Sequence, residues 1–148
     1  MPNADLRGLD LGGKAYFISG NLQGANFAGA KLSGARFIEV DVEGANFEKA
    51  NLQGVYARGA KFTNTNLLGA NMINFHAEPG EDIHTPTVDF SGSNLDKVKG
   101  HSSFLTGVKW SSETSLKGSN LADSRIDSDE YFETLQDKKT IHPWEHRL

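Results

Sequence analysis

Two short motifs contain residue types that could support chemistry. The run His142-Pro143-Trp144-Glu145-His146 has the spacing His-x-x-Glu-His of some zinc hydrolases. That chemistry needs a helix that places both histidines on one face, with the glutamate as the base. Pro143 and Trp144 fit such a helix badly, and no third ligand is obvious in the sequence. We therefore expect no metal site here.

The second motif, Gly8-Leu9-Asp10-Leu11-Gly12-Gly13-Lys14, nearly matches a phosphate-binding loop. Ala15 stands where that loop needs a magnesium-binding hydroxyl, and the strand-to-helix context is missing. The chain has no cysteine, which excludes disulfides, thiolate metal sites and cysteine nucleophiles. His76, His84 and His101 are scattered and are expected at the surface. The sequence predicts a protein that is not an enzyme and that holds no cofactor.

The composition restricts the class of protein further. The chain has 148 residues, which suits one domain. Its net charge is −4, and the acidic excess lies in residues 78–148, which argues against direct nucleic-acid binding. No stretch approaches the ~18 apolar residues of a membrane-spanning helix. The first residues, Met1 to Asp5, lack the basic start and apolar core of a secretory signal, so we expect a cytoplasmic protein.

The elements that must position any site follow from a repeat of five residues. One residue per unit, usually large and apolar, recurs in a single frame; we call these residues the centres. The centres are Phe17, Leu22, Phe27, Leu32, Phe37, Val42, Phe47, Leu52, Ala57, Phe62, Leu67, Met72 and Ala77. A small or short apolar residue usually stands two positions before each centre, and glycine is common two positions after it.

A period of five fits neither a helix nor a flat strand. It indicates a chain that turns a corner every five residues, so that four sides close a coil of about twenty residues and coils stack roughly 4.8 Å apart. The centres and the small residues point inward, and the residue between them points outward. Every fourth centre then forms a column. The column that runs from Phe17 through Phe37 to Ala57 and Ala77 loses volume along its length.

The units Ala25-Asn26-Phe27-Ala28-Gly29 and Ala50-Asn51-Leu52-Gln53-Gly54 resemble the consensus of the pentapeptide-repeat family. The resemblance covers most of the chain. It implies an all-β solenoid, the right-handed quadrilateral β-helix of that family.

Three interruptions divide the repeat. Lys14 and Glu113 are single extra residues, and residues 80–87 form an eight-residue polar insertion. We expect this insertion to loop out from a corner of the coil. The predicted organisation is a β-helix over residues 1–128, interrupted by the loop 80–87, followed by a cap over 129–148. The candidate partner-binding residues on the loop are Glu81, Asp82, Ile83 and His84.

The last residues have a different pattern. Asp127 and Glu130 form a plausible capping box for a short helix. An open solenoid end needs a cover, so one interpretation is that this helix and the tail cap the last coil. The other is a homodimer contact, since family members that act on topoisomerases often dimerise through C-terminal elements. The residues that either role would use are Tyr131, Phe132, Leu135 and Trp144.

The outward rows provide the remaining candidate surface. Asn21, Asp41 and Lys61 form one row, and Tyr16, Arg36, Tyr56 and His76 form another; two further rows are rich in asparagine. These rows either serve solubility and hydrogen bonding along the stack or form a rigid face for a partner.

Two functions follow as hypotheses. The first is a non-catalytic scaffold for protein–protein interaction with an unknown protein partner. The second, implied by the family resemblance, is a DNA-mimicking binder of DNA gyrase or another type II topoisomerase, as in members that protect gyrase from quinolones. The near-neutral first half departs from the continuous acidic stripe that a phosphate mimic needs. We expect no direct contact with nucleic acid or membrane, and either a monomer or a homodimer through the tail.

Overall fold

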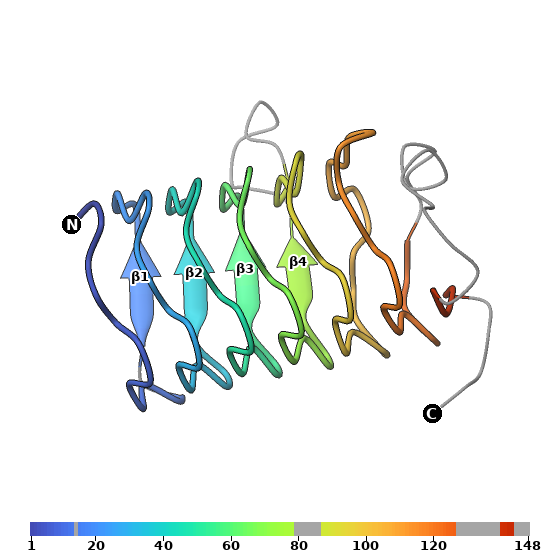
Figure 1. Ribbon diagram of the computed structural model, residues 1–148, viewed down its shortest axis with the longest axis horizontal. Coiled ribbons are helices and arrows are strands. Elements are labelled where there is room, and N and C mark those ends of the chain that lie inside the picture. Colours follow the sequence, from blue (N-terminus) through green and yellow to red (C-terminus); the bar gives the residue numbers. More distant parts are fainter. Residues whose placement is uncertain (14, 79–86, 127–139, 144–148) are drawn as a thin grey trace.

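The computed structural model describes residues 1–13, 15–78, 87–126 and 140–143. The chain winds into stacked four-sided coils that advance along one axis (Figure 1). One side of four successive coils forms a parallel sheet in the order β1-β2-β3-β4, with β1 at Tyr16–Ile18, β2 at Arg36–Ile38, β3 at Tyr56–Arg58 and β4 at His76–Glu78. The other sides are joined by single parallel bridges. No helix occurs in the described ranges.

Backbone hydrogen bonds between neighbouring coils hold the stack together. In the unit centred on Phe27, Asn26 N donates to Ala4 O of the preceding coil at 2.8 Å, and Phe27 N donates to Asn46 O of the next coil at 2.7 Å. Ala30 N then closes the corner by donating to Phe27 O at 2.9 Å. The same pattern recurs along the stack, so each coil satisfies the backbone of the next.

The pairing register confirms the predicted frame and its interruptions. Partners in uninterrupted coils are twenty residues apart, as in Asn26 with Asn46. The separation grows to 21 for Asp5 with Asn26, on either side of the extra residue at Lys14, and to 28 for Asn66 with Asn94. An insertion of eight residues is therefore absorbed without a change of register. The single insertion at Glu113 is likewise followed by a 21-residue step, from Asn94 to Ser115.

The centres form the columns that the repeat predicts. The rings of Phe27 and Phe47 stack with centroids 4.7 Å apart and an interplanar angle of 3°. Both side chains are fully buried, as is nearly every centre after the first coil. Such stacking places like side chains in contact at the coil spacing, and buried aromatic pairs add about 0.5–1.5 kcal/mol beyond their area.

The thinning column is filled from its neighbours. Phe75, a buried residue in the position usually taken by alanine, packs with its centroid 6.3 Å from Phe62 and 6.0 Å from Phe90. Its bulk offsets the small centres Ala57 and Ala77. Gly100 illustrates the same exchange, because a Cβ there would lie 2.9 Å from Leu121 Cδ2.

From the fourth coil onward, serine and threonine replace alanine at the small inward position. Ser103 is buried, and its hydroxyl donates to Met72 O at 2.7 Å while it accepts from Phe75 N at 3.3 Å. The hydroxyl of Ser124 likewise donates to Gly100 O at 2.9 Å. These hydroxyls join adjacent coils within the core, where an unsatisfied polar group would be costly.

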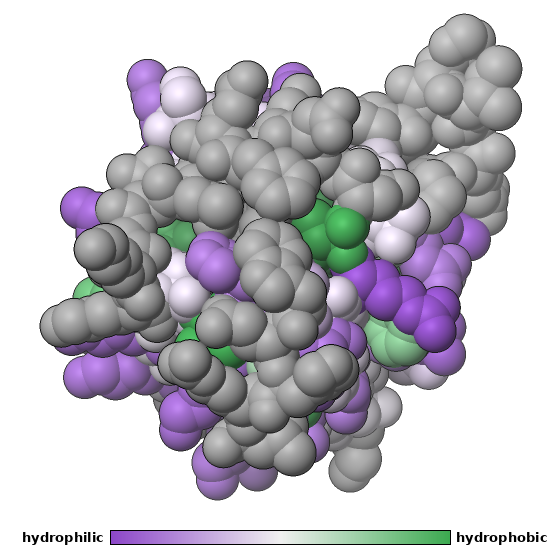
Figure 2. Space-filling model, turned by 90° about the vertical axis from the view of Figure 1, so that its right-hand side faces the viewer, coloured by the Kyte–Doolittle hydropathy of each residue, from purple (hydrophilic) through white to green (hydrophobic). Residues whose placement is uncertain are grey.

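The C-terminal coil is extended by the start of the tail. Ile141 pairs in parallel with Asn120, and Thr140 Oγ1 donates to Leu116 O at 2.6 Å. Residues 140–143 therefore add one more side to the stack. The helix expected at 129–139 lies outside the described residues and stays a prediction. In the view along the axis from this end, the described residues are mostly hydrophilic at the rim and hydrophobic nearer the middle (Figure 2).

The hydroxyls in the core generate the first prediction. Ser103→Ala should lower the free energy of unfolding by about 1–2 kcal/mol, because it removes hydrogen bonds that join two coils. Ser112→Ala is the matched control, since Ser112 is exposed and should change stability by less than ~0.5 kcal/mol. Equilibrium urea denaturation measures both. Equal stability of the two variants would show that these core hydroxyls do not stabilise the stack.

Candidate interaction surface

Three of the four sides of the coil use their outward residue to stabilise their own corner. Asn26 Oδ1 accepts from Ala28 N at 3.0 Å, and Asn66 Oδ1 accepts from Leu68 N at 3.1 Å. This Asx geometry, in which a side-chain oxygen accepts from the backbone two residues on, stabilises the turn. Asn66 Nδ2 also donates to Asn46 Oδ1 at 3.2 Å in the neighbouring coil. The asparagine rows therefore have a structural role.

A second row neutralises its own charge. Asp41, Lys61, Asp89 and Lys109 succeed one another along one side of the coil. Lys61 Nζ lies 3.8 Å from Asp41 Oδ2 and 2.6 Å from Glu43 Oε2, and Lys109 Nζ lies 3.8 Å from Asp89 Oδ2. The hydrogen bond to Glu43 raises the pKa of Lys61 above its usual value. Alternating signs leave no continuous acidic stripe on this row.

The fourth side is the outer face of the β1–β4 sheet and its continuation, and it carries no such caps. We call its outward row the ladder face. Its members, in order along the axis, are Tyr16, Arg36, Tyr56, His76, Phe104 and Arg125.

The ladder face consists of two stacks of alternating aromatic and cationic groups. The Arg36 guanidinium lies 5.7 Å from the Tyr16 ring centroid and 5.5 Å from that of Tyr56. In the second stack the Phe104 ring lies 4.4 Å from His76, and the Arg125 guanidinium lies 5.1 Å from Phe104. Each cation–π contact contributes about 0.5–1 kcal/mol at an exposed site. The side chains are thus held in place before any partner binds.

A second row of this face changes from apolar to charged along the axis. Ile18 and Ile38 stand beside the first stack, with Ile18 58% exposed, and Arg58 and Glu78 follow them. Tyr56 donates its hydroxyl to Glu78 Oε2 at 3.0 Å. Partial burial, followed by this hydrogen bond, raises the pKa of Tyr56. Tyr56 therefore points outward and does not fill the core beside Ala57.

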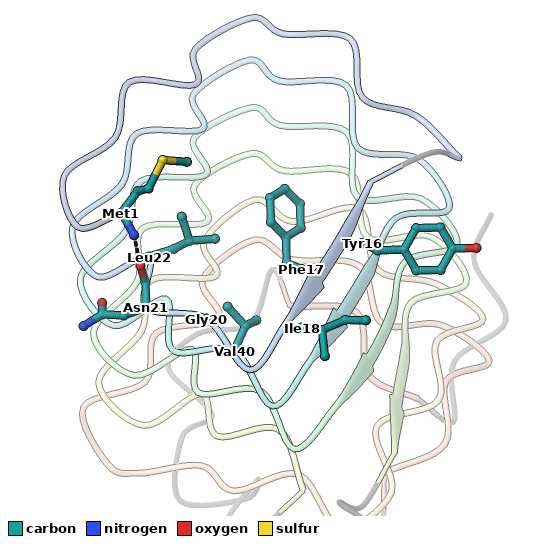
Figure 3. A pocket seen from close by; sticks show the side chains of 8 residues that line it. All are labelled: Met1, Tyr16, Phe17, Ile18, Gly20, Asn21, Leu22 and Val40. Carbon is teal, nitrogen blue, oxygen red and sulfur yellow. Dashed lines mark hydrogen bonds between the residues drawn. The ribbon is translucent and has the colours of Figure 1, made fainter.

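A depression of about 220 Å3 lies at the N-terminal end of the coil. Phe17 and Leu22 point into the coil and Tyr16 points away from it, while the Met1 amine donates to Asn21 O at 2.6 Å (Figure 3). The residues that line it are mostly apolar and include no nucleophile paired with a base. This depression is not arranged for catalysis.

The structure separates the other candidates that the sequence suggested. The loop residues Glu81, Asp82, Ile83 and His84 and the tail residues Tyr131, Phe132, Leu135 and Trp144 lie outside the described residues. Within the described ranges, no group of His, Cys, Asp or Glu could hold a metal ion, and no helix could span a membrane. Gly8 to Gly13 continue the coil instead of opening a helix.

The sequence analysis found only half of the ladder. It grouped Tyr16, Arg36, Tyr56 and His76 in one row but did not assign Phe104 and Arg125 to it. The eight-residue insertion hides them, because the row resumes 28 residues after His76 instead of twenty. Adding the insertion to the period would have found both.

The asparagine rows generate the second prediction. Asn66→Ala should lower the free energy of unfolding by about 1 kcal/mol, because Leu68 N loses its acceptor and Asn46 loses its donor. Lys99→Ala is the control at the equivalent outward position, where the exposed side chain caps no turn. Thermal unfolding followed by circular dichroism measures both. A larger loss for Lys99→Ala would contradict a structural role for the asparagine rows.

Comparison with known proteins identifies the repeat. The family model described as pentapeptide repeats matches residues 14–48 and 43–75, in eight copies. No significant match to a curated protein was found.

Two solved structures share the fold. A trypsin-treated form of QnrB1, a plasmid-mediated fluoroquinolone resistance protein, aligns with a TM-score of 0.54 and 19% identity over 95% of this chain and 78% of its own. Rfr23, a pentapeptide repeat protein from the cyanobacterium Cyanothece 51142, aligns with a TM-score of 0.52 and 20% identity over 95% and 88%. At these identities the likeness concerns the fold alone. Together, the repeat match, the register of the coils and these structures show that the chain is a pentapeptide-repeat protein.

Proposed function

We propose that the protein is a non-catalytic, rigid β-helical scaffold that binds a partner protein through the ladder face. The observation that carries the proposal is the difference between this face and the other three. On those three sides the outward residues cap turns or pair with one another, whereas the ladder face presents aromatic and arginine side chains that the turns do not need. Tyr16 is 61% exposed and Ile18 58%.

These residue types suit a protein interface. Tyrosine and arginine are enriched among the residues that dominate binding energy at interfaces. The stacking of Arg36 between Tyr16 and Tyr56 reduces the side-chain entropy that binding would otherwise cost. The coil beneath is held by backbone bonds on every side, so the face is rigid.

The topoisomerase hypothesis has less support on the described surface. A mimic of duplex DNA needs a continuous row of unpaired carboxylates, whereas Asp41 and Asp89 pair with Lys61 and Lys109. The likeness to QnrB1 is a likeness of fold. We therefore treat gyrase as one named partner to be tested, and the loop and tail candidates as further contacts of that hypothesis.

The third prediction tests the ladder face by quantitative capture from the cells that make the protein. We expect one protein to be retained by the wild type and lost about tenfold by the double variant Tyr16→Ser with Arg36→Ser. The control Lys31→Ser with Lys99→Ser removes two exposed cations from another side and should retain it. Calorimetry with the purified pair then measures the dissociation constant of each variant.

Two results would overturn the proposal. If every retained protein binds the ladder variant and the control equally, the ladder face is not the interface. If the wild type inhibits gyrase supercoiling, or protects it from a quinolone, and the ladder variant acts equally well, the topoisomerase hypothesis replaces ours. Circular dichroism of both double variants establishes that each is folded.

A further inference from the structure

The ladder face leaves particular atoms available to a ligand. In each stack the ring faces are covered, because Arg36 lies between two tyrosines and Phe104 lies between His76 and Arg125. The rings of Tyr16 and Tyr56 therefore lend their faces to the guanidinium. What the row presents outward is mainly edges: the N–H groups of the arginines and the polar atoms of tyrosine and histidine.

The two stacked arginines keep their charge unpaired by carboxylates. Arg36 and Arg125 are both exposed, and neither forms an ion pair with any residue in the described ranges. This contrasts with Lys31, Lys61 and Lys109, each of which lies within 4 Å of an acidic oxygen. A guanidinium whose faces are covered and whose edge is free matches a carboxylate, which can accept two parallel N–H bonds.

The spacing of the two arginines sets a distance. Four steps of pairing separate them, from Arg36 through Tyr56, His76 and Phe104 to Arg125. At about 4.8 Å per step, the arginines lie roughly 19 Å apart along the axis. An extended peptide that rises about 3.3 Å per residue covers this distance in roughly six residues. Residues six apart in an extended chain project from the same face, so both carboxylates can point at the ladder.

We propose that the ladder face binds an extended acidic segment of a partner protein, with two carboxylates about six residues apart that engage Arg36 and Arg125. This inference rests on the proposed function and specifies the chemistry of the partner. An apolar residue of the segment covers Ile18 and Ile38 at the β1 end of the face.

The same observations disfavour a nucleic acid as the occupant. Single-stranded nucleic acids bind by stacking bases on exposed aromatic faces, and here the ring faces are taken by neighbouring side chains. Glu39 is exposed at the end of β2 and Glu78 closes β4, so evenly spaced phosphates would meet carboxylates. A phosphate chain also has no aliphatic group to cover Ile18.

The fourth prediction uses designed peptides of twelve residues. The spaced peptide has leucine at position 1 and glutamates at positions 3 and 9, with alanine and threonine elsewhere. The compact peptide has the same composition with glutamates at positions 3 and 6. We expect the spaced peptide to bind about tenfold more tightly, because only its carboxylates reach both arginines. Shifts of the arginine Nε–Hε signals in NMR titrations report the affinity and the site.

Substitutions then test the two arginines. Arg36→Gln and Arg125→Gln should each remove the preference for the spaced peptide, because each leaves one carboxylate unpaired. Arg7→Gln is the control, since Arg7 pairs with Asp5 at 2.7 Å near the N-terminus and should leave the preference unchanged. Equal binding of the two peptides by the wild type, or an unchanged preference in both ladder variants, would overturn the inference. A single-stranded oligo(dT) probe that shifts the same signals at lower concentration would replace the acidic segment with a nucleic acid.

Failure of this inference can be distinguished from failure of the proposed function. If the captured protein needs Tyr16 and Arg36 but the spaced peptide has no advantage, the scaffold function stands and the partner's chemistry is wrong. If the peptide binds as expected but no captured protein depends on the face, the site exists and the proposed function is wrong. Loss of both results rejects both.

Discussion

Everything in this molecule depends on the requirement that each coil return to the register of the coil before it. The backbone N–H groups of Asn26 and Phe27 bond to opposite neighbours, so a coil that returned one residue early would lose both bonds. It would also turn the inward residue outward, because inside and outside alternate along each side. The chain meets this requirement by placing its extra residues between the paired positions.

The periodic part of the structure could be predicted from the sequence because it follows from this requirement. The centres, the columns and the lengths of the interruptions all depend on counting, and the pairings of Asn66 with Asn94 and of Asp5 with Asn26 agree with the count. Lateral exchanges could not be predicted in this way. The compensation of Ala77 by Phe75 depends on how neighbouring columns pack, which a one-dimensional repeat does not encode.

The candidate site shows the same division. The first four members of the ladder share a clean period, so the sequence grouped them, but their stacking depends on side-chain geometry. Neither the loop 80–87 nor the tail 129–148 obeys the period, and the roles given to their residues stay predictions. The described surface shows a division of labour instead. Sides with turns commit their outward side chains to capping, whereas a side with regular parallel strands satisfies its backbone within the sheet and leaves those side chains free.

The register that resumes after the insertion has a consequence for how such a protein can change. The chain leaves the coil after Glu78, the last residue of β4, and by Asp89 it is paired with Lys61 as though nothing had intervened. Length can therefore be added or removed at this corner while the sheet keeps its spacing. A new sequence grafted there would start from the edge of the ladder face. The fold thus separates a constant ruler from a variable attachment point, which allows selection or design to alter one without rebuilding the other.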